Sequence, residues 1–415
     1  MKKTLTLLIL HYFRVLAKVQ ISKVKLLQKI EGKTLTIVGI TGSAGKSSTL
    51  SACEAVLKDY FNVKTNGGSN SETGIPFSIL GIKATSYSPI DWLKYTLLAL
   101  IKLITNWQSY DIFLLEMGID EPDEPKNMSY LLKIVRPTIG IFLNVNLVHS
   151  QQFDKTISQN ITGDQRQPLI LKNIGQEKAN LINSLPSTGH ALINSQDPIV
   201  SSTTQITLAK KTELKPIHVD LKKYAPPKSF DVSVSAAINL ANIFKIDKSK
   251  AIHSLQKNLV LPPSRSSVFK GISNSTIIDS SYNSSPLACS EMLDVLSKYP
   301  SPKIAILGDM RELGLQSKSA HEKIYQKALK SADTIISVGV ETRQYFGAKA
   351  IKFTDWSEAN EYIKQNLKPN STILIKGSQN TIYLEEIVKS LLQNPADASL
   401  ICRQSPYWQK VKSTL

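Results

Sequence analysis

Short apolar runs alternate along this chain with segments whose apolar residues recur every three or four positions. The runs, which are typical of buried strands, cover residues 35–38, 110–115, 138–143 and 190–194. The periodic segments, which are typical of helices, cover residues 50–60 and 92–107 and resume at residue 176. Strands that alternate with helices form parallel sheets covered by helices. The pattern therefore predicts an α/β fold for the first part of the chain.

The same alternation returns from residue 262 onward. Strands are expected at residues 275–279, 303–307, 334–338, 350–353 and 372–375. Helical stretches separate them, so a second, Rossmann-like α/β unit is predicted. We interpret residues 151–175 as a loop or irregular insertion. Residues 401–415 have no predicted element and are expected to pack back on the body.

The first 33 residues are strongly basic, with eight lysines and arginines against one acid, Glu31. Apolar residues fall at helical spacing at Leu5, Leu8, Ile9, Tyr12, Leu16 and Val19. The segment predicts a basic amphipathic helix, which either packs on the domain behind it or lies on an anionic membrane surface. His11, Arg14 and Lys18 interrupt the apolar run before the ~20 residues that a spanning helix needs. Neither a spanning segment nor a signal peptide is expected.

A glycine-rich stretch lies between the first predicted strand and the helix after it. It reads Gly42-Ser43-Ala44-Gly45-Lys46-Ser47-Ser48. Glycines let backbone N–H groups turn toward a polyphosphate, and the N-terminus of the following helix adds partial positive charge. In such loops the lysine reaches the β- and γ-phosphates and the next hydroxyl ligates Mg²⁺. Although Ile40 replaces the first glycine of the strict motif, the stretch predicts ATP or GTP binding rather than an ordinary turn.

Three further polar features lie at or after the ends of predicted strands. Residues 66–76 form a long polar turn of the kind that often carries function. Glu116 ends a buried strand, where open α/β sheets place metal-binding groups, although a capping or ion-pairing role is equally open. Asn144 ends the next strand, and His149 follows it. A lone histidine is more often structural than catalytic.

Composition narrows the choice of partner. The net charge of +17, from 50 basic and 33 acidic residues, favours an anionic partner such as a nucleotide, a nucleic acid or a membrane surface. The lysines are spread along the whole chain without an aromatic-interleaved basic motif, so nucleic-acid binding is not expected. Cys53, Cys289 and Cys402 lack pair spacing. They argue against a disulfide framework and a zinc site, and they suit a reducing cytoplasm.

The order of these motifs resembles the Mur ligase family, ATP-dependent enzymes that join an amino group to a carboxylate. The resemblance covers nearly all of residues 35–393 and includes the glycine loop, the polar turn, Glu116 in Glu-Met-Gly, and the spacing of Asn144 and His149. Later stretches that match the family are Pro263-Ser264-Arg265, residues 277–286, residues 307–314 with His321, and Lys376-Gly377-Ser378.

The resemblance implies a P-loop ATPase central domain with a mostly parallel sheet over residues 34–261 and a C-terminal domain over 262–415, after the helix of 1–33. It implies that nucleotide contacts come from Gly42, Ser43, Ala44, Gly45, Lys46, Ser47, Ser48, Asn144, Arg265, Asp279, Tyr282 and Asn283. The implied metal ligands are Ser47, Glu116, His149 and a carbamylated Lys178. Lys46, His149 and Lys178 are the implied catalytic residues.

The implied reaction uses ATP and Mg²⁺ to convert a carboxylate into an acyl phosphate, which an amine then displaces. Residues 307–314 and 376–378 are closest to the branch that adds D-alanyl-D-alanine to a UDP-N-acetylmuramoyl-tripeptide. The expected substrates are therefore a nucleotide-linked or lipid-linked muropeptide and D-alanyl-D-alanine. We expect a cytoplasmic monomer, with peripheral membrane contact possible through residues 1–33.

Several departures keep other acceptors open. Ser280 replaces the second aspartate of the tyrosine motif, and residues 230–234 replace a segment that helps to hold adenine. The family's N-terminal UDP-binding domain is not expected, since the basic helix stands in its place. A ligase of the polyglutamate type, a ligase for a lipid-linked wall precursor, and a nucleotide-binding scaffold without chemistry are the alternatives.

Overall fold

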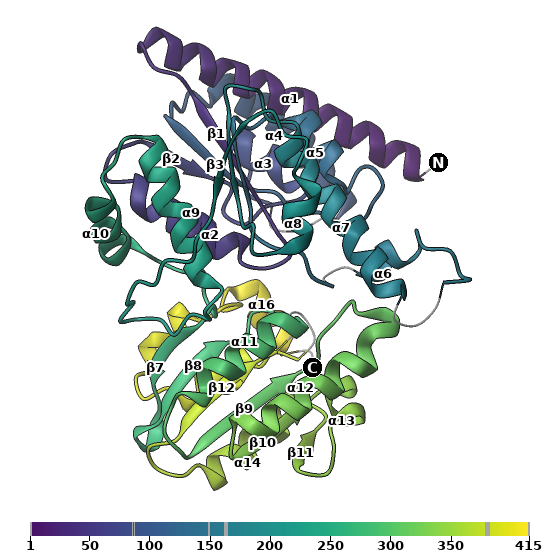
Figure 1. Cartoon of the computed structure of the whole chain (residues 1–415), viewed down its shortest axis with the longest axis vertical. Helices are drawn as coiled ribbons and strands as arrows, with labels where there is room; N and C mark the ends of the chain where they lie inside the picture. The colour runs from purple at the N-terminus through teal and green to yellow at the C-terminus, as the bar shows by residue number, and fades with distance from the viewer. Residues whose placement is uncertain are drawn as a thin grey trace. The chain divides into compact units, whose positions relative to one another are not determined.

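The computed structural model of the chain describes residues 2–84, 86, 88–147, 150–161, 165–377 and 382–413. The chain forms two compact units (Figure 1). The first consists of Met1–Val219 and Val232–Val260, and the second of Asp220–Asp231 and Leu261–Leu415. Each unit contains a six-stranded sheet. The predicted α/β fold class is confirmed.

The sheet of the first unit has the strand order β2-β3-β1-β4-β5-β6, and its pairings within the described residues are parallel. Its strands are β1 (Thr36–Thr41), β2 (Val63–Thr65), β3 (Ile112–Glu116), β4 (Ile139–Phe142), β5 (His190–Ile193) and β6 (Lys210–Glu213). The central strand β1 lies between β3 and β4. Because the carboxyl ends of parallel strands meet at one edge of a sheet, the residues that follow these three strands lie together.

Within the described residues, ten helices pack around this sheet or continue from it. They are α1 (Lys2–Ile30), α2 (Lys46–Leu57), α3 (Gly74–Leu80), α4 (Pro89–Thr105), α5 (Met128–Ile134), α6 (Ser150–Asp154), α7 (Arg166–Asn183), α8 (Pro198–Thr203), α9 (Phe230–Ile243) and α10 (Lys248–Asn258). The main core joins one face of the sheet, at Ile37, Phe113 and Leu115, to α1, α3, α5 and α7.

The interpretation of residues 151–175 as an irregular insertion is wrong, because α6 and the first half of α7 lie there. Two apparent helix breakers concealed the helical period. Pro168 lies in the first turn of α7, where proline is tolerated. Gly175 lies against α8, and a Cβ added to it would come within 2.3 Å of Ile199 Cγ2. The glycine is therefore needed for the close approach of the two helices.

The predicted helix at the N-terminus is present, but its buried face differs from the expected one. The buried side consists of Leu10, Phe13, Ala17, Ile21 and Val24. The expected positions Leu5, Leu8 and Val19 are exposed instead. The helix carries two apolar stripes, and the one with the aromatic ring of Phe13 is the one that packs on the unit.

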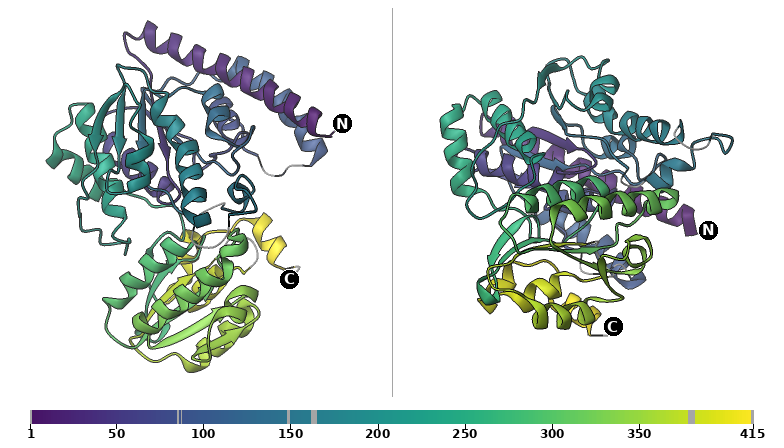
Figure 2. Two further views of the ribbon diagram at one scale, coloured as in Figure 1. Left: turned by 45° about the vertical axis from the view of Figure 1, so that its right-hand side comes forward. Right: turned by 60° about the horizontal axis from the view of Figure 1, so that its bottom comes forward.

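A small core fastens α1 to α3 and α4. The ring of Phe13 on α1 meets Phe77 of α3 edge-on at 4.8 Å between centroids, and Phe77 meets Tyr95 of α4 at 5.3 Å. The hydroxyl of Tyr12 also donates to the Thr96 carbonyl at 2.8 Å. As a result, α4 runs beside α1 on the outside of the first unit (Figure 2).

The length and composition of Leu5–Ile30 are sufficient for a membrane span. His11, Arg14 and Lys18, from which no spanning segment was expected, do not lower the hydropathy of this helix enough to exclude one. The same test is also passed by signal sequences and by core helices of soluble proteins. It therefore decides nothing by itself.

The sheet of the second unit has the order β11-β10-β9-β12-β8-β7, parallel except for the antiparallel pair of β7 and β8. Its strands are β7 (Ser267–Lys270), β8 (Thr276–Ser280), β9 (Lys303–Gly308), β10 (Thr334–Val338), β11 (Ala350–Phe353) and β12 (Thr372–Lys376). The helices are α11 (Pro286–Ser297), α12 (Ser317–Ser331), α13 (Val340–Tyr345), α14 (Trp356–Asn366), α15 (Glu385–Leu391) and α16 (Pro406–Lys412). The predicted second α/β unit is thus present.

Candidate nucleotide and metal site

The glycine loop connects the end of β1 directly to the first residue of α2. Gly45 has φ = +82°, a left-handed conformation that side chains with a Cβ rarely adopt, and Lys46 begins the helix immediately after it. No side chain of the described residues caps this helix N-terminus. Since the first N–H groups of a helix have no intrahelical acceptors, the loop presents unused donors and the positive end of a helix dipole. This is a fitting cradle for a phosphate group.

Asn144, which follows β4, holds the middle of the loop in place. Its side chain accepts a hydrogen bond from the Ala44 N–H at 2.9 Å and donates one to the Ala44 carbonyl at 3.1 Å. The Ser43 hydroxyl donates to the Asn146 carbonyl at 3.2 Å. Asn144 was predicted as a nucleotide contact, and in the structure its side chain supports the loop that would make such contacts.

Two lysines share one carbonyl oxygen of the loop. The Lys46 ammonium donates to the Gly42 carbonyl at 2.9 Å, and the Lys178 amine on α7 donates to the same oxygen at 3.3 Å. Lys178 is only 3% exposed. Burial, and next the positive charge of Lys46, lower the pKa of Lys178 well below its usual value. A buried lysine that is readily neutral is able to react with carbon dioxide, as carbamylation requires.

A hydroxyl and a carboxylate meet beside the loop, as the chemistry of a hard divalent cation requires. The Ser47 Oγ donates to Glu116 Oε2 at 2.7 Å, and the Asn70 amide donates to Glu116 Oε1 at 2.8 Å. Asn66 holds the backbone of Glu116 from both sides, at 2.9 and 3.0 Å. The polar turn at 66–76 therefore orients the predicted metal ligand. Its polar composition predicted a functional role but not this contact.

His149 lies outside the described residues. Among the residues that the structure describes, no group of three or more histidine, cysteine, aspartate or glutamate side chains is placed to hold a metal. The donors at the loop, Ser47 and Glu116, would fit one divalent cation, whose other ligands would be phosphate oxygens and water. The assignment of Lys178 and His149 to a second metal stays a prediction.

We expect Asn70→Ala to weaken divalent-metal binding by about 10–100-fold, because partners that orient a ligating carboxylate usually contribute that much. The metal dependence of ATP binding, followed by calorimetry, measures the effect. Asn366→Ala is the matched control, since that amide is exposed at the end of α14 and bonds only to the Tyr362 carbonyl among the described residues. An unchanged metal affinity in the Asn70 variant would contradict the role of Glu116.

In the second unit, Asp279 lies beneath the loops that carry other predicted residues. Its carboxylate is fully buried and accepts hydrogen bonds from the hydroxyls of Ser264 and Ser281, each at 2.7 Å. Burial raises the pKa of the Asp279 carboxyl, and the hydrogen bonds from the two serines lower it in part. Ser264 and Ser281 adjoin Arg265 and Tyr282. Asp279 thus supports these two residues, although it was predicted as a nucleotide contact itself.

Arg265 and Tyr282 lie against each other, with the guanidinium carbon 4.6 Å from the ring centroid. The Arg265 Nε is buried and has no hydrogen-bond partner among the described residues. Lys376, which is also buried, donates to the carbonyls of Ser280 and Asn283, and burial lowers the pKa of Lys376 to about 8. Lys376 thereby fixes the segment that carries Tyr282 and Asn283. Ser378, which follows it in the matched stretch, lies outside the described residues.

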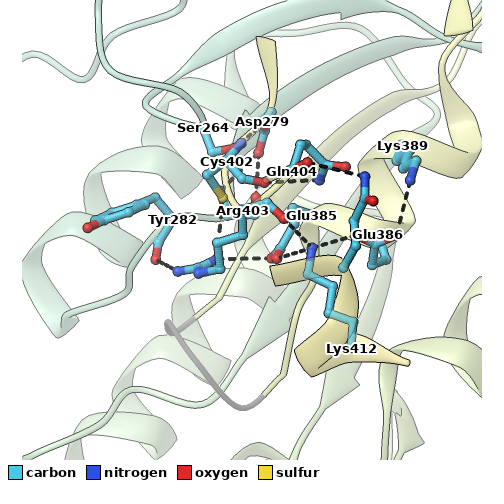
Figure 3. A network of polar contacts seen from close by, with 12 residues as sticks. Ser264, Asp279, Tyr282, Glu385, Glu386, Lys389, Cys402, Arg403, Gln404 and Lys412 are labelled. Carbon is cyan, nitrogen blue, oxygen red and sulfur yellow. Dashed lines mark hydrogen bonds and ion pairs between the residues drawn. The ribbon is translucent and has the colours of Figure 1, made fainter. Parts of the chain in front are cut away.

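The C-terminal tail packs back on the second unit, and it does so through a buried ion network (Figure 3). Arg403 pairs with Glu385 at 3.0 Å and donates to the Tyr282 carbonyl at 2.6 Å. Lys412 on α16 pairs with the same glutamate at 2.9 Å. Both partners of the Arg403–Glu385 pair are almost fully buried. The tail therefore holds Tyr282 in position, a role for which the sequence of residues 401–415 offered no signal.

Arg403→Ala is expected to lower the free energy of unfolding of the second unit by about 3 kcal/mol, because breaking a buried pair leaves a poorly compensated charge. Chemical denaturation measures the change. Lys389→Ala is the control, because Lys389 is exposed and lies 3.9 Å from Glu386. Its loss should cost less than about 0.5 kcal/mol. Equal effects of the two substitutions would refute the role of the network.

The loop after β9 is held by a buried histidine. His321 Nε2 accepts from the Met310 N–H at 3.0 Å, and Nδ1 lies 2.8 Å from the Ser317 carbonyl. Because a carbonyl only accepts, Nδ1 carries the proton. His321 is thus a neutral positioning residue for the segment 307–314.

A glycine loop at the end of a central parallel strand, with a lysine at the helix start and a hydroxyl–carboxylate pair beside it, defines a P-loop nucleotide-binding protein. Comparison with known proteins gives the family. Residues 40–162 match the Mur ligase middle domain, and residues 264–379 match the domain described as Mur ligase, glutamate ligase domain. The chain belongs to the Mur ligase family, as its motifs predicted.

Curated relatives and solved structures agree. The UDP-N-acetylmuramoyl-tripeptide–D-alanyl-D-alanine ligase of Escherichia coli is 22% identical over 86% of this chain and 77% of its own length. The ligase of that name from Synechocystis is 25% identical over 87% of this chain and 76% of its own. The fold is similar to that of MurF ligase from Thermotoga maritima in complex with ADP, with a TM-score of 0.69 and 21% identity over 91% of this chain and 83% of that one. Escherichia coli FolC with ADP is more distant, at a TM-score of 0.59 and 14% identity over 92% of this chain and 94% of that one.

These matches confirm the predicted class of enzyme, an ATP-dependent ligase that forms an amide bond. Neighbouring structures contain ADP, or AMPPNP with manganese, which supports the use of ATP and a divalent metal.

Proposed function

We propose that this protein joins D-alanyl-D-alanine to the free carboxylate of a UDP-N-acetylmuramoyl-tripeptide, at the expense of ATP, in the synthesis of peptidoglycan precursors. The observation that carries the chemistry is the pair of Ser47 and Glu116, 2.7 Å apart, next to Lys46 at the start of α2. The names of the relatives, which align over most of this chain, supply the substrates. FolC-like ligation is less favoured because its structural likeness is lower.

The proposed reaction has two steps, formation of an acyl phosphate and its displacement by the amine. A carboxylate oxygen of the muropeptide attacks the γ-phosphorus of ATP, the bond to the bridging oxygen breaks, and ADP leaves. The amino nitrogen of D-alanyl-D-alanine then attacks the carbonyl carbon of the acyl phosphate, loses its proton, and expels inorganic phosphate. The loop N–H groups and Lys46 hold the phosphates in line and balance the charge that moves to the β/γ-bridge.

The remaining predicted residues support these steps. Ser47 and Glu116 would hold a Mg²⁺ ion, and His149 with a carbamylated Lys178 a second one. The ions supply charge neutralisation on the phosphate oxygens. Arg265, Tyr282 and Asn283 are proposed to contact the nucleotide. We further propose that the enzyme works as a monomer in the cytoplasm, for which the unpaired, buried cysteines are suited.

The direct test is phosphate release by the purified protein with ATP and Mg²⁺. We expect release to require UDP-N-acetylmuramoyl-tripeptide and D-alanyl-D-alanine together, with the new amide visible by mass spectrometry. Release that depends on glutamate and a folate instead would favour the FolC-like alternative. ATP binding that depends on Lys46 without release in any mixture would overturn the proposed substrates but leave the nucleotide site intact.

A further inference from the structure

The outer side of α1 carries a continuous apolar stripe that its packing leaves uncovered. Its large side chains are between 42% and 74% exposed and recur at intervals of three, four or seven residues, with the half-buried Tyr12 in the same row. They are Leu5, Leu8, Val15, Val19, Leu26 and Ile30. The opposite face of the helix, at Phe13, Ala17 and Val24, is fully buried against the first unit. The helix is therefore anchored to the protein by one face while a second apolar face points outward.

The neighbouring helix α4 has the same character. Its exposed apolar side chains are between 46% and 71% accessible, namely Ile90, Leu93, Leu97, Leu100, Ile101 and Ile104. Its buried side chains, Tyr95 and Ala99, belong to the small core that also contains Phe13. Trp107, just beyond the helix, is 65% exposed. A soluble helix normally turns polar residues outward, so this pattern needs a covering partner.

The two stripes form one surface because the helices are fastened side by side. Tyr12 donates to the Thr96 carbonyl at 2.8 Å, and Lys23 donates to the Leu103 carbonyl at 2.9 Å. Contacts between α1 and α4 therefore occur in the same order along both helices, which run parallel. On helical geometry, the exposed stripe of α1 lies on the side of that helix nearest α4. We name this surface, made by the exposed apolar residues of α1 and α4, the α1–α4 face.

Charge decides which partner fits the α1–α4 face. Helix α1 contains seven lysines and arginines and no acidic residue. Its exposed cations Lys18, Lys25 and Lys29 lie beside the apolar stripe. The only acid in α4 is Asp91, and its carboxylate accepts hydrogen bonds from the hydroxyls of Ser86 and Ser88 at the helix start. An apolar stripe flanked by cations matches the acyl region and headgroups of an anionic bilayer.

A second copy of the chain fits less well. In a symmetric dimer each patch meets its own copy. The basic flank of one α1 would then face the basic flank of the other, with Asp91 at the start of α4 as the one acid on these helices. Aromatic and cationic groups together, as in the stack of Lys23 on Trp107 at 3.7 Å, are also typical of side chains at the level of lipid headgroups.

We propose that the α1–α4 face docks on an anionic membrane surface, with both helices lying in the plane of the interface. The ligase is thus a peripheral membrane protein. Helix α1 does not span the bilayer in this arrangement, although its composition would allow it, because its inner face is occupied by the core of the first unit. Membrane contact therefore involves α4 as much as the N-terminal helix.

The test is flotation of the full-length protein with vesicles of mixed phosphatidylcholine and phosphatidylglycerol, compared with vesicles of phosphatidylcholine alone. The wild type is expected to float with the anionic vesicles and to dissociate as salt is raised. The triple substitution Leu93→Gln, Leu97→Gln and Ile104→Gln should lower the partition coefficient at least about tenfold, because three exposed apolar side chains no longer enter the interface. Glutamine is a good helix former, so α4 should persist.

The matched control replaces Ile206, Leu208 and Leu315, which are even more exposed, by glutamine, and it should bind vesicles like the wild type. Thermal unfolding of both triple variants checks that the fold is retained. Failure of the wild type to bind anionic vesicles, or equal binding by the α4 variant, would overturn the proposal. Vesicle binding that resists alkaline carbonate would indicate a spanning α1 and would also overturn it. Dimers in vesicle-free solution that the α4 substitutions abolish would show that the face is a contact between copies instead.

Discussion

Lys46→Ala is expected to lower the rate of ATP-dependent ligation at least about 100-fold, since removing one preorganised charge partner of the transition state typically costs this much or more. Lys46 begins α2 directly after the glycine loop. Its ammonium rests on the Gly42 carbonyl at 2.9 Å, where it is ready to turn toward a phosphate. Phosphate release and amide formation measure the loss.

The fold should survive this substitution, because Lys46 is half-buried and contributes no core packing. Thermal unfolding without ATP should therefore be unchanged, while the stabilisation by added ATP should decrease. Lys364→Ala, at an exposed position of α14, is the control and should behave as the wild type. Ligation at the wild-type rate by the Lys46 variant would mean that the glycine loop is not the nucleotide site.

Lys178→Ala and Lys178→Arg are both expected to be nearly inactive, for different reasons. Alanine removes the side chain that would carry the carbamate, and the guanidinium of arginine keeps its positive charge and forms no carbamate. A small added carboxylate such as formate or acetate should restore part of the activity to the alanine variant only. The cavity left at a site 3% exposed gives such an anion a place to bind.

The carbamate itself can be observed. Burial lowers the pKa of Lys178, which enlarges the fraction of the neutral amine, the form that attacks carbon dioxide. Isotopically labelled bicarbonate should therefore produce a carbamate signal in the wild type that is absent from Lys178→Arg. Wild-type activity in Lys178→Arg would show that the carbamate, if one is present, lies elsewhere.

The sequence predicted the elements with strong local patterns. The strands β10 and β11 have the expected bounds, because their apolar runs are flanked by clear helical segments. The polar edge strand β6, Lys-Lys-Thr-Glu, carries no such run and was missed. The face that α1 buries could not be predicted, because the helix has two apolar stripes. The stripe that packs inward is selected by residues distant in the sequence, namely the main core of the first unit and the rings of Phe77 and Tyr95.

The site residues likewise include some that local sequence pattern predicts and some that depend on contacts between distant residues. Ser47 and Glu116 are expected to lie close together, because they follow or end the parallel neighbouring strands β1 and β3, whose carboxyl ends meet at one edge of the sheet. The amide of Asn70 on Glu116, and the contact of Arg403 with Tyr282, join residues between 46 and 121 positions apart. Local pattern carries no information on such pairs. The roles of Asn70 and Arg403 can therefore be predicted only when the fold is known.

The central claim is that ATP activates the muropeptide carboxylate as an acyl phosphate at the Gly42–Ser48 loop. Its most direct test uses tripeptide substrate whose acceptor carboxylate carries a heavy oxygen isotope, incubated with ATP, Mg²⁺ and D-alanyl-D-alanine. The mechanism predicts that the released phosphate acquires one heavy oxygen from the carboxylate for each amide formed, and that Lys46→Ala forms neither product. Unlabelled phosphate released together with the amide would contradict the acyl-phosphate route.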